Sequence, residues 1–328
     1  MISDSGKSAR RFLHDSANRD CVDPGAMKAN ERCHCEERSD EAISLVRGCL
    51  FVEERDMHRV LITGAGGGIG RALRETLRGL YPVLRLSDRV KLAPARSGND
   101  GVEEVDQTDI ADIAAVERMV EGVDGIIHLG GISGENSWEK ILEGNIIGLY
   151  NVFEAARRAG VQRIVMATSN HAVGFYPRAQ TIDHKVVPRP DSRYGVSKAF
   201  SEALASLYSD KHGIGFLCTR IGNFGARPID SRRLSIWISP RDYTQLVRIG
   251  LEHPDIRYEI VYGVSNNGRS WYDNSNAYRL GYRPQDDSEP YAGEILAAEA
   301  GQPKDPIAER FQGGTFCADQ YDAPSPRD

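Results

Sequence analysis

A short apolar run followed at once by a cluster of glycines constrains this chain more than any other stretch. Residues 59–63 read RVLIT, which is too short for a helix and rich in β-branched side chains, and residues 64–70 read GAGGGIG. Leu73, Leu77 and Leu80 then recur at the spacing of one helix face. A strand, a glycine turn and a helix in this order predict an α/β fold with a parallel sheet.

The glycine turn predicts a dinucleotide site. Gly64, Gly67 and Gly70 fit the pattern G-x-x-G-x-x-G, whereas Ile69 occupies the last position of the commoner G-x-G-x-x-G. In this setting the backbone N–H groups and the positive end of the helix lie beneath a pyrophosphate. Glycine clusters also form plain loops, but the flanking strand and helix favour the dinucleotide.

A carboxylate at the end of the next predicted strand indicates which dinucleotide is bound. Residues 83–87 form that strand and Asp88 follows it, about 20 residues past the glycines, where a carboxylate accepts hydrogen bonds from the ribose and repels a 2′-phosphate. Arg89 beside it softens that repulsion. We predict NAD in preference to NADP.

The next predicted strand covers residues 102–105 and leads to a second set of candidate cofactor contacts. Asp109 and Ile110 are placed to contact the adenine. Asp109 is equally suited to be the N-cap of a helix that starts near Ala111, and both interpretations stay open.

Residues 125–129 form another predicted buried strand, which ends in small residues. Gly130 and Gly131, after Leu129, let a cofactor approach the backbone at the edge where open α/β sheets bind ligands. We interpret His128, inside the apolar run, as a core residue and not as a catalyst.

Asn145 interrupts a predicted helix over residues 138–158, whose apolar stripe is formed by Leu142, Ile146, Leu149 and Phe153. Asparagine is a mediocre helix former. It is either a polar support for the active site or a solvent-facing residue, and the pattern does not separate the two.

Tyr194 and Lys198 are spaced to lie on the same face of a helix. Tyrosine, with a reference pKa of ~10, is a poor base at neutral pH. We expect a lysine ammonium beside it to favour the phenolate and bring the pKa toward the working range. Ser169 follows a predicted strand over residues 161–167, where its hydroxyl can hold a reacting oxygen while Tyr194 removes the proton.

Composition excludes several other classes of protein. The 328 residues carry a net charge of -6 and are 40% hydrophobic, typical of a soluble globular chain and unfavourable for binding nucleic acid. No apolar run approaches the roughly 20 residues that cross a bilayer, and no secretory signal is present. We predict a cytoplasmic protein without membrane, nucleic-acid or metal partners. The cysteines, including the closely spaced Cys33 and Cys35, are interpreted as free thiols.

Residues 1–56 differ from the rest of the chain, because they are dense in charge with only brief apolar patches. Our hypothesis is that Met57 is the true start and that this segment is a disordered or non-native extension; the alternative is a genuine regulatory or targeting arm. Residues 57–317 are then one catalytic domain with a substrate lobe mainly in 223–317, followed by a frayed tail over 318–328.

Taken together, these motifs resemble an extended short-chain dehydrogenase/reductase. A narrower resemblance is to bacterial uronate dehydrogenases, and it extends from Met57 to Cys317. It is carried by the segments HLGGIS (128–133), GNIIGLYN (144–151), SNH (169–171) and RFQGGTF (310–316).

The resemblance implies a Rossmann-type doubly wound parallel sheet with a small C-terminal substrate-binding lobe. It implies NAD-dependent oxidation of the C1 hydroxyl of pyranose D-galacturonate or D-glucuronate to the aldarolactone, a step of hexuronate catabolism, in a homo-oligomer. In this scheme Tyr194 is the general base, Lys198 tunes it and binds the nicotinamide ribose, and Ser169 positions the substrate oxygen. His171 is expected to donate a hydrogen bond to the substrate.

Two sets of binding residues follow. The predicted cofactor contacts are Gly64, Gly67, Gly68, Ile69, Gly70, Asp88, Asp109, Ile110, Leu129, Gly130, Gly131, Asn145 and Lys198. The predicted substrate contacts are Ser133, Ser169, Asn170, His171, Tyr194, Asn223 and Arg232.

A hexuronate carboxylate requires a cationic partner, and a guanidinium can bind two of its oxygens. Arg232 or Arg233 is the candidate, although a solvated surface pair is the simpler interpretation of the residues alone; the resemblance favours Arg232. Asn223 stands where we expect a smaller serine in the relatives, and its longer reach could alter the preference between C4 epimers.

Two other functions are compatible with parts of the pattern. A nucleotide-sugar epimerase or dehydratase shares the tyrosine and lysine but retains its NAD. A non-catalytic dinucleotide-sensing protein would need only the glycine turn, and the intact Ser169, Tyr194 and Lys198 argue against it.

Overall fold

The computed structural model describes residues 57–99 and 101–323. The predicted extension over residues 1–56, with the hypothesis of a start at Met57, lies outside the described residues, as does the end of the predicted tail, 324–328. All described residues belong to one compact unit of the chain, Asp56–Asp328.

The centre of this unit is a mainly parallel sheet whose strand order reverses beside its first strand. The order is β10 (Tyr258–Gly263), β7 (Gly215–Ile221), β6 (Arg163–Ser169), β5 (Gly125–His128), β1 (Arg59–Thr63), β2 (Val83–Asp88), β4 (Gly101–Gln107) and β3 (Ser97–Gly98). Only β3 pairs in the antiparallel sense. This confirms the predicted doubly wound sheet, and such sheets bind ligands at the carboxyl ends of the strands flanking the reversal.

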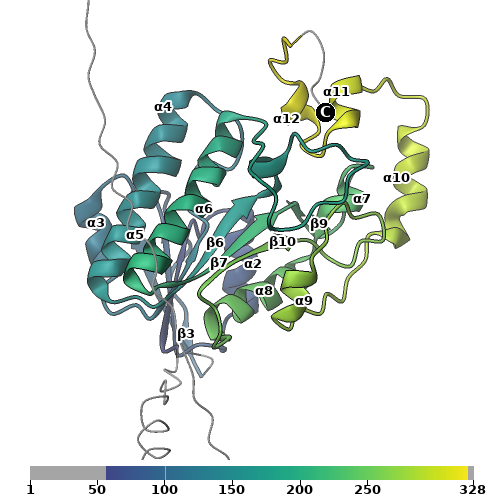
Figure 1. The fold of residues 1–328 in the computed structure, drawn as a ribbon. Helices are drawn as coiled ribbons and strands as arrows, with labels where there is room; N and C mark the ends of the chain where they lie inside the picture. Colours follow the sequence, from purple (N-terminus) through teal and green to yellow (C-terminus); the bar gives the residue numbers. More distant parts are fainter. Residues whose placement is uncertain (1–56, 100, 324–328) are drawn as a thin grey trace, which may run out of the picture. The chain divides into compact units, whose positions relative to one another are not determined.

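Two layers of helices enclose the sheet (Figure 1). The helices α3 (Ile113–Met119), α5 (Gly148–Ala159) and α6 (Arg193–His212) pack on one face, and α2 (Gly68–Thr76) and α8 (Pro240–Glu252) pack on the other. The central strands are buried on both faces, which explains their continuous apolar sequence.

The helix after the glycine turn is shorter than its apolar spacing predicts. It ends at Thr76, so Leu73 and Leu77 are buried while Leu80 lies beyond the helix and is 46% exposed. The helix predicted near Ala111 also begins later. Asp112, and not Asp109, caps α3, because its carboxylate accepts hydrogen bonds from the N–H groups of its first turn.

The helix predicted over residues 138–158 is broken into three parts. A short helix α4 (Trp138–Ile141) leads into a π-helical turn η1 (Leu142–Ile147) and then into α5. Asn145 lies within the π turn, and such turns inside α-helices frequently mark functional sites.

The C-terminal segments cover the carboxyl ends of the strands. In Figure 1 the helices α11 (Pro306–Arg310) and α12 (Thr315–Ala318) lie above the sheet, and α10 (Ala292–Glu299) lies to the right of it. The same C-terminal half of the chain contains the short helix α7 (Arg233–Ile236) and a two-stranded sheet formed by β8 (Asn223–Phe224) and β9 (Trp237–Ile238). The remaining short elements are α9 (Ser275–Arg279) and η3 (Glu289–Tyr291).

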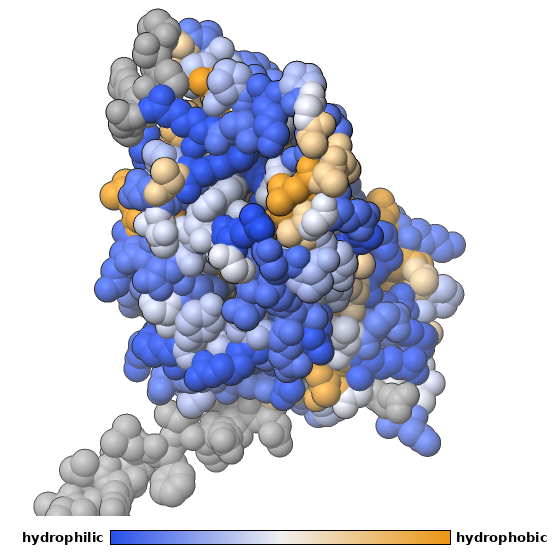
Figure 2. Space-filling view, turned by 90° about the vertical axis from the view of Figure 1, so that its right-hand side faces the viewer, coloured by the Kyte–Doolittle hydropathy of each residue, from blue (hydrophilic) through white to orange (hydrophobic). Residues whose placement is uncertain are grey.

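The face shown in Figure 2 is mainly hydrophilic, and its hydrophobic residues gather in small separate patches. Among the described residues, no helix is long and apolar enough to cross a membrane.

Candidate active site

A cavity of about 700 Å³ opens at the carboxyl ends of the strands, between the sheet and the C-terminal segments. Its walls bring together ten of the residues selected from the sequence. They are Ile69, Leu129, Gly131, Ser133, Ser169, His171, Tyr194, Lys198, Asn223 and Arg232. The sheet topology explains this convergence, because these residues come from turns and helices that follow different strands at the same edge.

Tyr194 lies in the first turn of α6 and is almost fully buried. Burial is the main cause that raises its pKa, to about 12; the charge of Asp191 also raises the pKa, while a hydrogen bond with Ser169 lowers it. The expectation that Lys198 brings the Tyr194 pKa toward the working range is therefore wrong, because the loss of water around the phenolate dominates.

Lys198 lies one turn further along α6 and is also buried. Its Nζ donates to the carbonyl of Ala167 at 2.9 Å and lies 5.5 Å from the centroid of the Tyr194 ring. Burial lowers the Lys198 pKa to about 8. The ammonium is thus fixed beside the tyrosine at neutral pH.

Ser169 ends β6, where its hydroxyl caps the 3-10 turn η2 (Asn170–Val173). Its Oγ accepts a hydrogen bond from the backbone N–H of His171 at 3.2 Å. Its hydrogen can still be donated to an oxygen in the cavity, as in the hydrogen bond with Tyr194 that lowers the pKa of the phenol.

His171 contacts a carboxylate that the sequence did not single out. Its Nδ1 is 2.7 Å from Oδ2 of Asp191, and its ring stacks on Phe316 with the centroids 3.9 Å apart. Asp191 lies outside every motif considered in the sequence, and only the fold brings it to η2. Phe316 is the last residue of the segment RFQGGTF (310–316), but the sequence did not select it as a site residue.

Arg232 also lines the cavity, where other protein groups orient it. Its Nε donates to the carbonyl of Gln312 at 2.8 Å, and Nη2 donates to the amide oxygen of Asn170 at 2.8 Å. Asn170 is fully buried behind it and donates in turn to the carbonyl of Ile221. Asn170 supports the cavity wall from behind and does not line it.

No carboxylate of the described residues lies within ion-pair distance of Arg232, and burial lowers the pKa of its guanidinium. Arg233, the other candidate, pairs instead with Asp230. An arginine that is desolvated but lacks a carboxylate partner has unused capacity for an anionic ligand.

The glycine turn fits a dinucleotide pyrophosphate, because side chains at two of its positions would collide with the backbone. A Cβ on Gly64 would lie 2.8 Å from the backbone of Leu129 and Gly130, and Gly64 has φ +68°. A Cβ on Gly70 would lie 2.5 Å from the Gly64 carbonyl. The turn is compact and directs the start of α2 toward the cavity.

Asp88 stands at the end of β2, next to this turn. Its carboxylate accepts from the N–H groups of Gly66 at 2.9 Å and Val90 at 3.1 Å. Asp109 lies further out, and its carboxylate accepts from the N–H of Ala111. Ile110 packs against Gly148, where a Cβ would come within 2.6 Å of it.

Asn145 is buried, which rules out the solvent-facing interpretation. Its amide holds the backbone N–H and carbonyl of Ile132 at 2.7 and 3.0 Å and donates to Ser197 Oγ at 3.0 Å. The π turn thereby ties the loop that carries Gly131 to the helix that carries Tyr194. Asn145 acts in this structure as a polar support.

His128 is buried in β5, in agreement with the core interpretation. Its Nδ1 is 2.8 Å from Oγ1 of Thr63, which also accepts from the N–H of Gly130 at 3.2 Å. Burial first, and then the charge of Lys198, lowers the pKa of His128 to about 3. The ring is therefore neutral and fixes the loop after β5.

Comparisons with known proteins agree with this site. The sequence model of the NAD dependent epimerase/dehydratase family matches residues 60–251. The chain belongs to that family. Membership confirms the predicted fold class and the dependence on NAD.

Within the NAD dependent epimerase/dehydratase family, the chain is similar to enzymes that act on sugar acids. It is 46% identical to a uronate dehydrogenase of Pseudomonas syringae, over 80% of this chain and 94% of the relative. It is 47% identical to that of Pseudomonas putida, over 79% and 95% of the two chains. A crystal structure of a mutant uronate dehydrogenase from Agrobacterium tumefaciens complexed with NAD has a TM-score of 0.75 and 45% identity, over 80% and 97% of the two chains. The resemblance stated from the motifs is confirmed.

Proposed function

We propose that this chain is a cytoplasmic, NAD-dependent uronate dehydrogenase. It oxidises the C1 hydroxyl of a pyranose hexuronate, D-galacturonate or D-glucuronate, and releases the aldarolactone. Support comes from relatives of that name at 46% and 47% identity, which align over nearly their whole length. The expected homo-oligomeric state stays a prediction.

The partly buried Arg232 is the observation that carries the choice of substrate. It lines the same cavity as Tyr194, has no carboxylate partner among residues 57–99 and 101–323, and is oriented by Asn170 and Gln312. The carboxylate of a hexuronate would supply the missing charge, and a planar guanidinium binds two of its oxygens at once. A neutral sugar would leave that charge unpaired.

The proton chemistry belongs to Tyr194 and Ser169. Ser169 holds the C1 oxygen through its hydroxyl, because its own oxygen already accepts from the N–H of His171. Tyr194 Oη removes the C1 hydroxyl proton, and the ammonium of Lys198 beside the ring stabilises the phenolate that takes it. Removing the proton makes C1 a better hydride donor.

The glycine turn and Asp88 would hold NAD, which would supply the acceptor for the C1 hydride. The Gly64 and Gly70 positions that exclude a Cβ support that placement. Lys198, Leu129 and Gly131 would adjoin its nicotinamide half, since they line the cavity between the turn and Tyr194.

The proposal predicts that Arg232→Ala loses selectivity for acidic sugars. The KM for galacturonate should rise at least about 10-fold, equivalent to about 1.4 kcal/mol, while the slow oxidation of galactose changes little. Steady-state kinetics of NADH formation measure both. Arg233→Ala is the matched control, because Arg233 already pairs with Asp230. An unchanged KM for galacturonate in Arg232→Ala would remove Arg232 from the substrate site.

A further inference from the structure

Asp191 is a buried carboxylate that the proposed mechanism does not use. It lies just before α6, and its side chain is fully inaccessible. Oδ2 is 2.7 Å from Nδ1 of His171, and Oδ1 accepts from the hydroxyl of Ser192 at 2.8 Å. A buried charge with so few hydrogen-bond partners lowers the stability of the fold. We therefore expect Asp191 to have a function beside the cavity.

Two glycines leave space for this carboxylate and for nothing larger. A Cβ on Gly174 would lie 1.8 Å from Oδ2 of Asp191, and a Cβ on Gly313 would lie 2.0 Å from the same atom. The two backbones are joined by a hydrogen bond from Gly313 N–H to the Gly174 carbonyl at 2.8 Å. The Asp191 carboxylate is therefore held in a single position, with Oδ2 directed at Nδ1 of His171.

The His171 ring is fixed on its other sides as well. Phe316 stacks on it, and the edge of Tyr194 meets it at a centroid distance of 5.9 Å. The ring lines the cavity, and Nε2 has no hydrogen-bond partner among residues 57–99 and 101–323. Because Nε2 lies across the ring from Nδ1, it is the nitrogen left for a ligand.

A carboxylate can only accept, so Nδ1 must carry the proton in this pair. In a neutral imidazole the other nitrogen then has a lone pair and accepts. We propose that Asp191 is a positioning residue that keeps the proton of His171 on Nδ1, so that Nε2 accepts a hydrogen bond from a ring hydroxyl of the sugar. This differs from the donor role expected from the sequence.

The inference deepens the proposed function and rests on it for the sugar. It divides recognition between two residues that line the cavity: Arg232 binds the carboxylate, and His171 selects a hydroxyl that can donate. Replacing that hydroxyl by fluorine, which cannot donate, should weaken binding, whereas a donor at Nε2 would tolerate fluorine.

Other charged groups respond to Asp191, and the test must separate them from His171. The negative charge of Asp191 raises the pKa of Tyr194 and of Cys317, and it opposes the lowering of the Arg232 pKa. Removing the charge therefore makes Tyr194 easier to deprotonate. We expect Asp191→Asn to raise KM while kcat is retained, a split that general loss of structure would not give.

The direct test is the nitrogen NMR spectrum of histidine-labelled protein, with the His171 signal assigned by its loss in His171→Gln. The wild type should show the proton on Nδ1. In Asp191→Asn the new side-chain amide can also donate a hydrogen bond to Nδ1. The fraction of His171 with its proton on Nδ1 should therefore fall. Asp124→Asn is the matched control, because Asp124 accepts two backbone hydrogen bonds, from His58 and Arg59, at the opposite edge of the sheet.

The kinetic arm compares galacturonate with analogues that carry fluorine in place of one ring hydroxyl at a time. One analogue should show a KM raised about 10-fold in the wild type, and that penalty should shrink in Asp191→Asn. Gly313→Ala, which displaces Oδ2, should behave like Asp191→Asn, whereas Gly293→Ala, whose Cβ meets no atom within 4 Å, should not.

A wild-type His171 with its proton on Nε2, or an Asp191→Asn protein with an unchanged tautomer and unchanged fluorine penalties, would overturn the inference. The tautomer is read on the free protein, so it decides the role of Asp191 even without turnover. A wild type that oxidises no uronate contradicts the proposed function instead.

Discussion

At the scale of single residues, burial governs the pKa of Tyr194, the proposed proton acceptor. Burial raises this pKa to about 12, and the hydrogen bond with Ser169 offsets only part of the rise. The phenol is therefore protonated at neutral pH. In the proposed reaction the phenol oxygen of Tyr194 takes the proton, whereas its ring serves only for packing.

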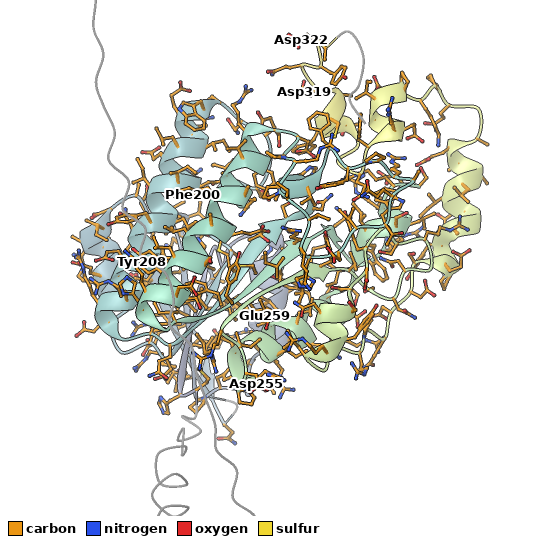
Figure 3. All side chains as sticks on the ribbon, viewed as in Figure 1. Phe200, Tyr208, Asp255, Glu259, Asp319 and Asp322 are labelled. Carbon is orange, nitrogen blue, oxygen red and sulfur yellow. The ribbon has the colours of Figure 1, made fainter. Side chains whose placement is uncertain are left out.

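Tyr194→Phe should lower kcat at least about 100-fold, the lower end of what a positioned acid or base contributes. The ring packing is preserved, so the melting temperature should change little. Tyr208→Phe is the control: Tyr208 lies lower on the same helix (Figure 3), where its hydroxyl bonds Glu154 away from the cavity. Wild-type kcat in Tyr194→Phe would show that another group takes the proton.

The sequence predicted which residues lie together best where their positions depend on local spacing. Tyr194, Lys198 and Ser169 converge because a strand and a helix place them. Asp191 was missed, since its contact with His171 is formed by a loop and two distant glycines that have no common pattern. The expected effect of Lys198 on the Tyr194 pKa was also wrong, because the sequence does not show how deeply the phenol is buried.

At the scale of secondary-structure elements, the glycine turn is held by close contact of its own backbone. A Cβ on Gly70 would come within 2.5 Å of the Gly64 carbonyl and 2.6 Å of the Ala65 Cα. A side chain at position 70 therefore requires the backbone of Gly64 and Ala65 to move away from α2.

Gly70→Ala should destabilise the protein by about 1–3 kcal/mol, the usual cost of overpacking, although alanine is otherwise the better helix former. NAD affinity should fall with it, as measured by calorimetric titration alongside urea unfolding. Gly268→Ala, with no atom within 4 Å of its Cβ, is the control. Equal stability and NAD affinity in Gly70→Ala would contradict the close-contact account.

Periodicity predicted which elements exist better than where they end. The strand β1 begins and ends as predicted, because its apolar run is bounded by glycine. The π turn at Asn145 was not predictable, since it depends on hydrogen bonds with Ile132 and Ser197 from other segments. Asn145 could be assigned as a support only after those partners were placed.

At the scale of the whole molecule, an acidic side chain joins the far edge of the sheet to its covering helix. Glu103 on β4 accepts from Arg74 at 2.6 Å and from Arg96 at 2.7 Å, and its side chain is 3% exposed. Burial alone would raise its pKa, but the hydrogen bonds from the two arginines outweigh this and lower the pKa to about 2.

This shift predicts an acid-sensitive fold. A carboxyl group whose folded pKa is lowered stabilises the protein fully above its unfolded value of 4.5 and loses that effect as the pH falls toward 2. The difference in unfolding free energy between wild type and Glu103→Gln should therefore narrow from pH 7 to about pH 3. Urea unfolding of both proteins at pH 7 and pH 3 measures this difference in free energy. An equal difference at the two pH values would contradict the lowered pKa of Glu103.

The fold class and the dependence on NAD followed from the sequence because each element carried its own signal. The residues alone did not show which arginine binds the carboxylate, since Arg232 and Arg233 are adjacent and chemically identical, and only the resemblance favoured Arg232. The structure adds a physical distinction, because Arg233 pairs with Asp230.

The central claim is tested most directly by NADH formation when the full chain is supplied with NAD and a panel of uronates and UDP-sugars. We predict one NADH for each D-galacturonate or D-glucuronate consumed, with the aldarolactone as product, and no net NADH from UDP-sugars. Interconversion of a UDP-sugar without net NADH, together with no turnover of any uronate, would contradict the account.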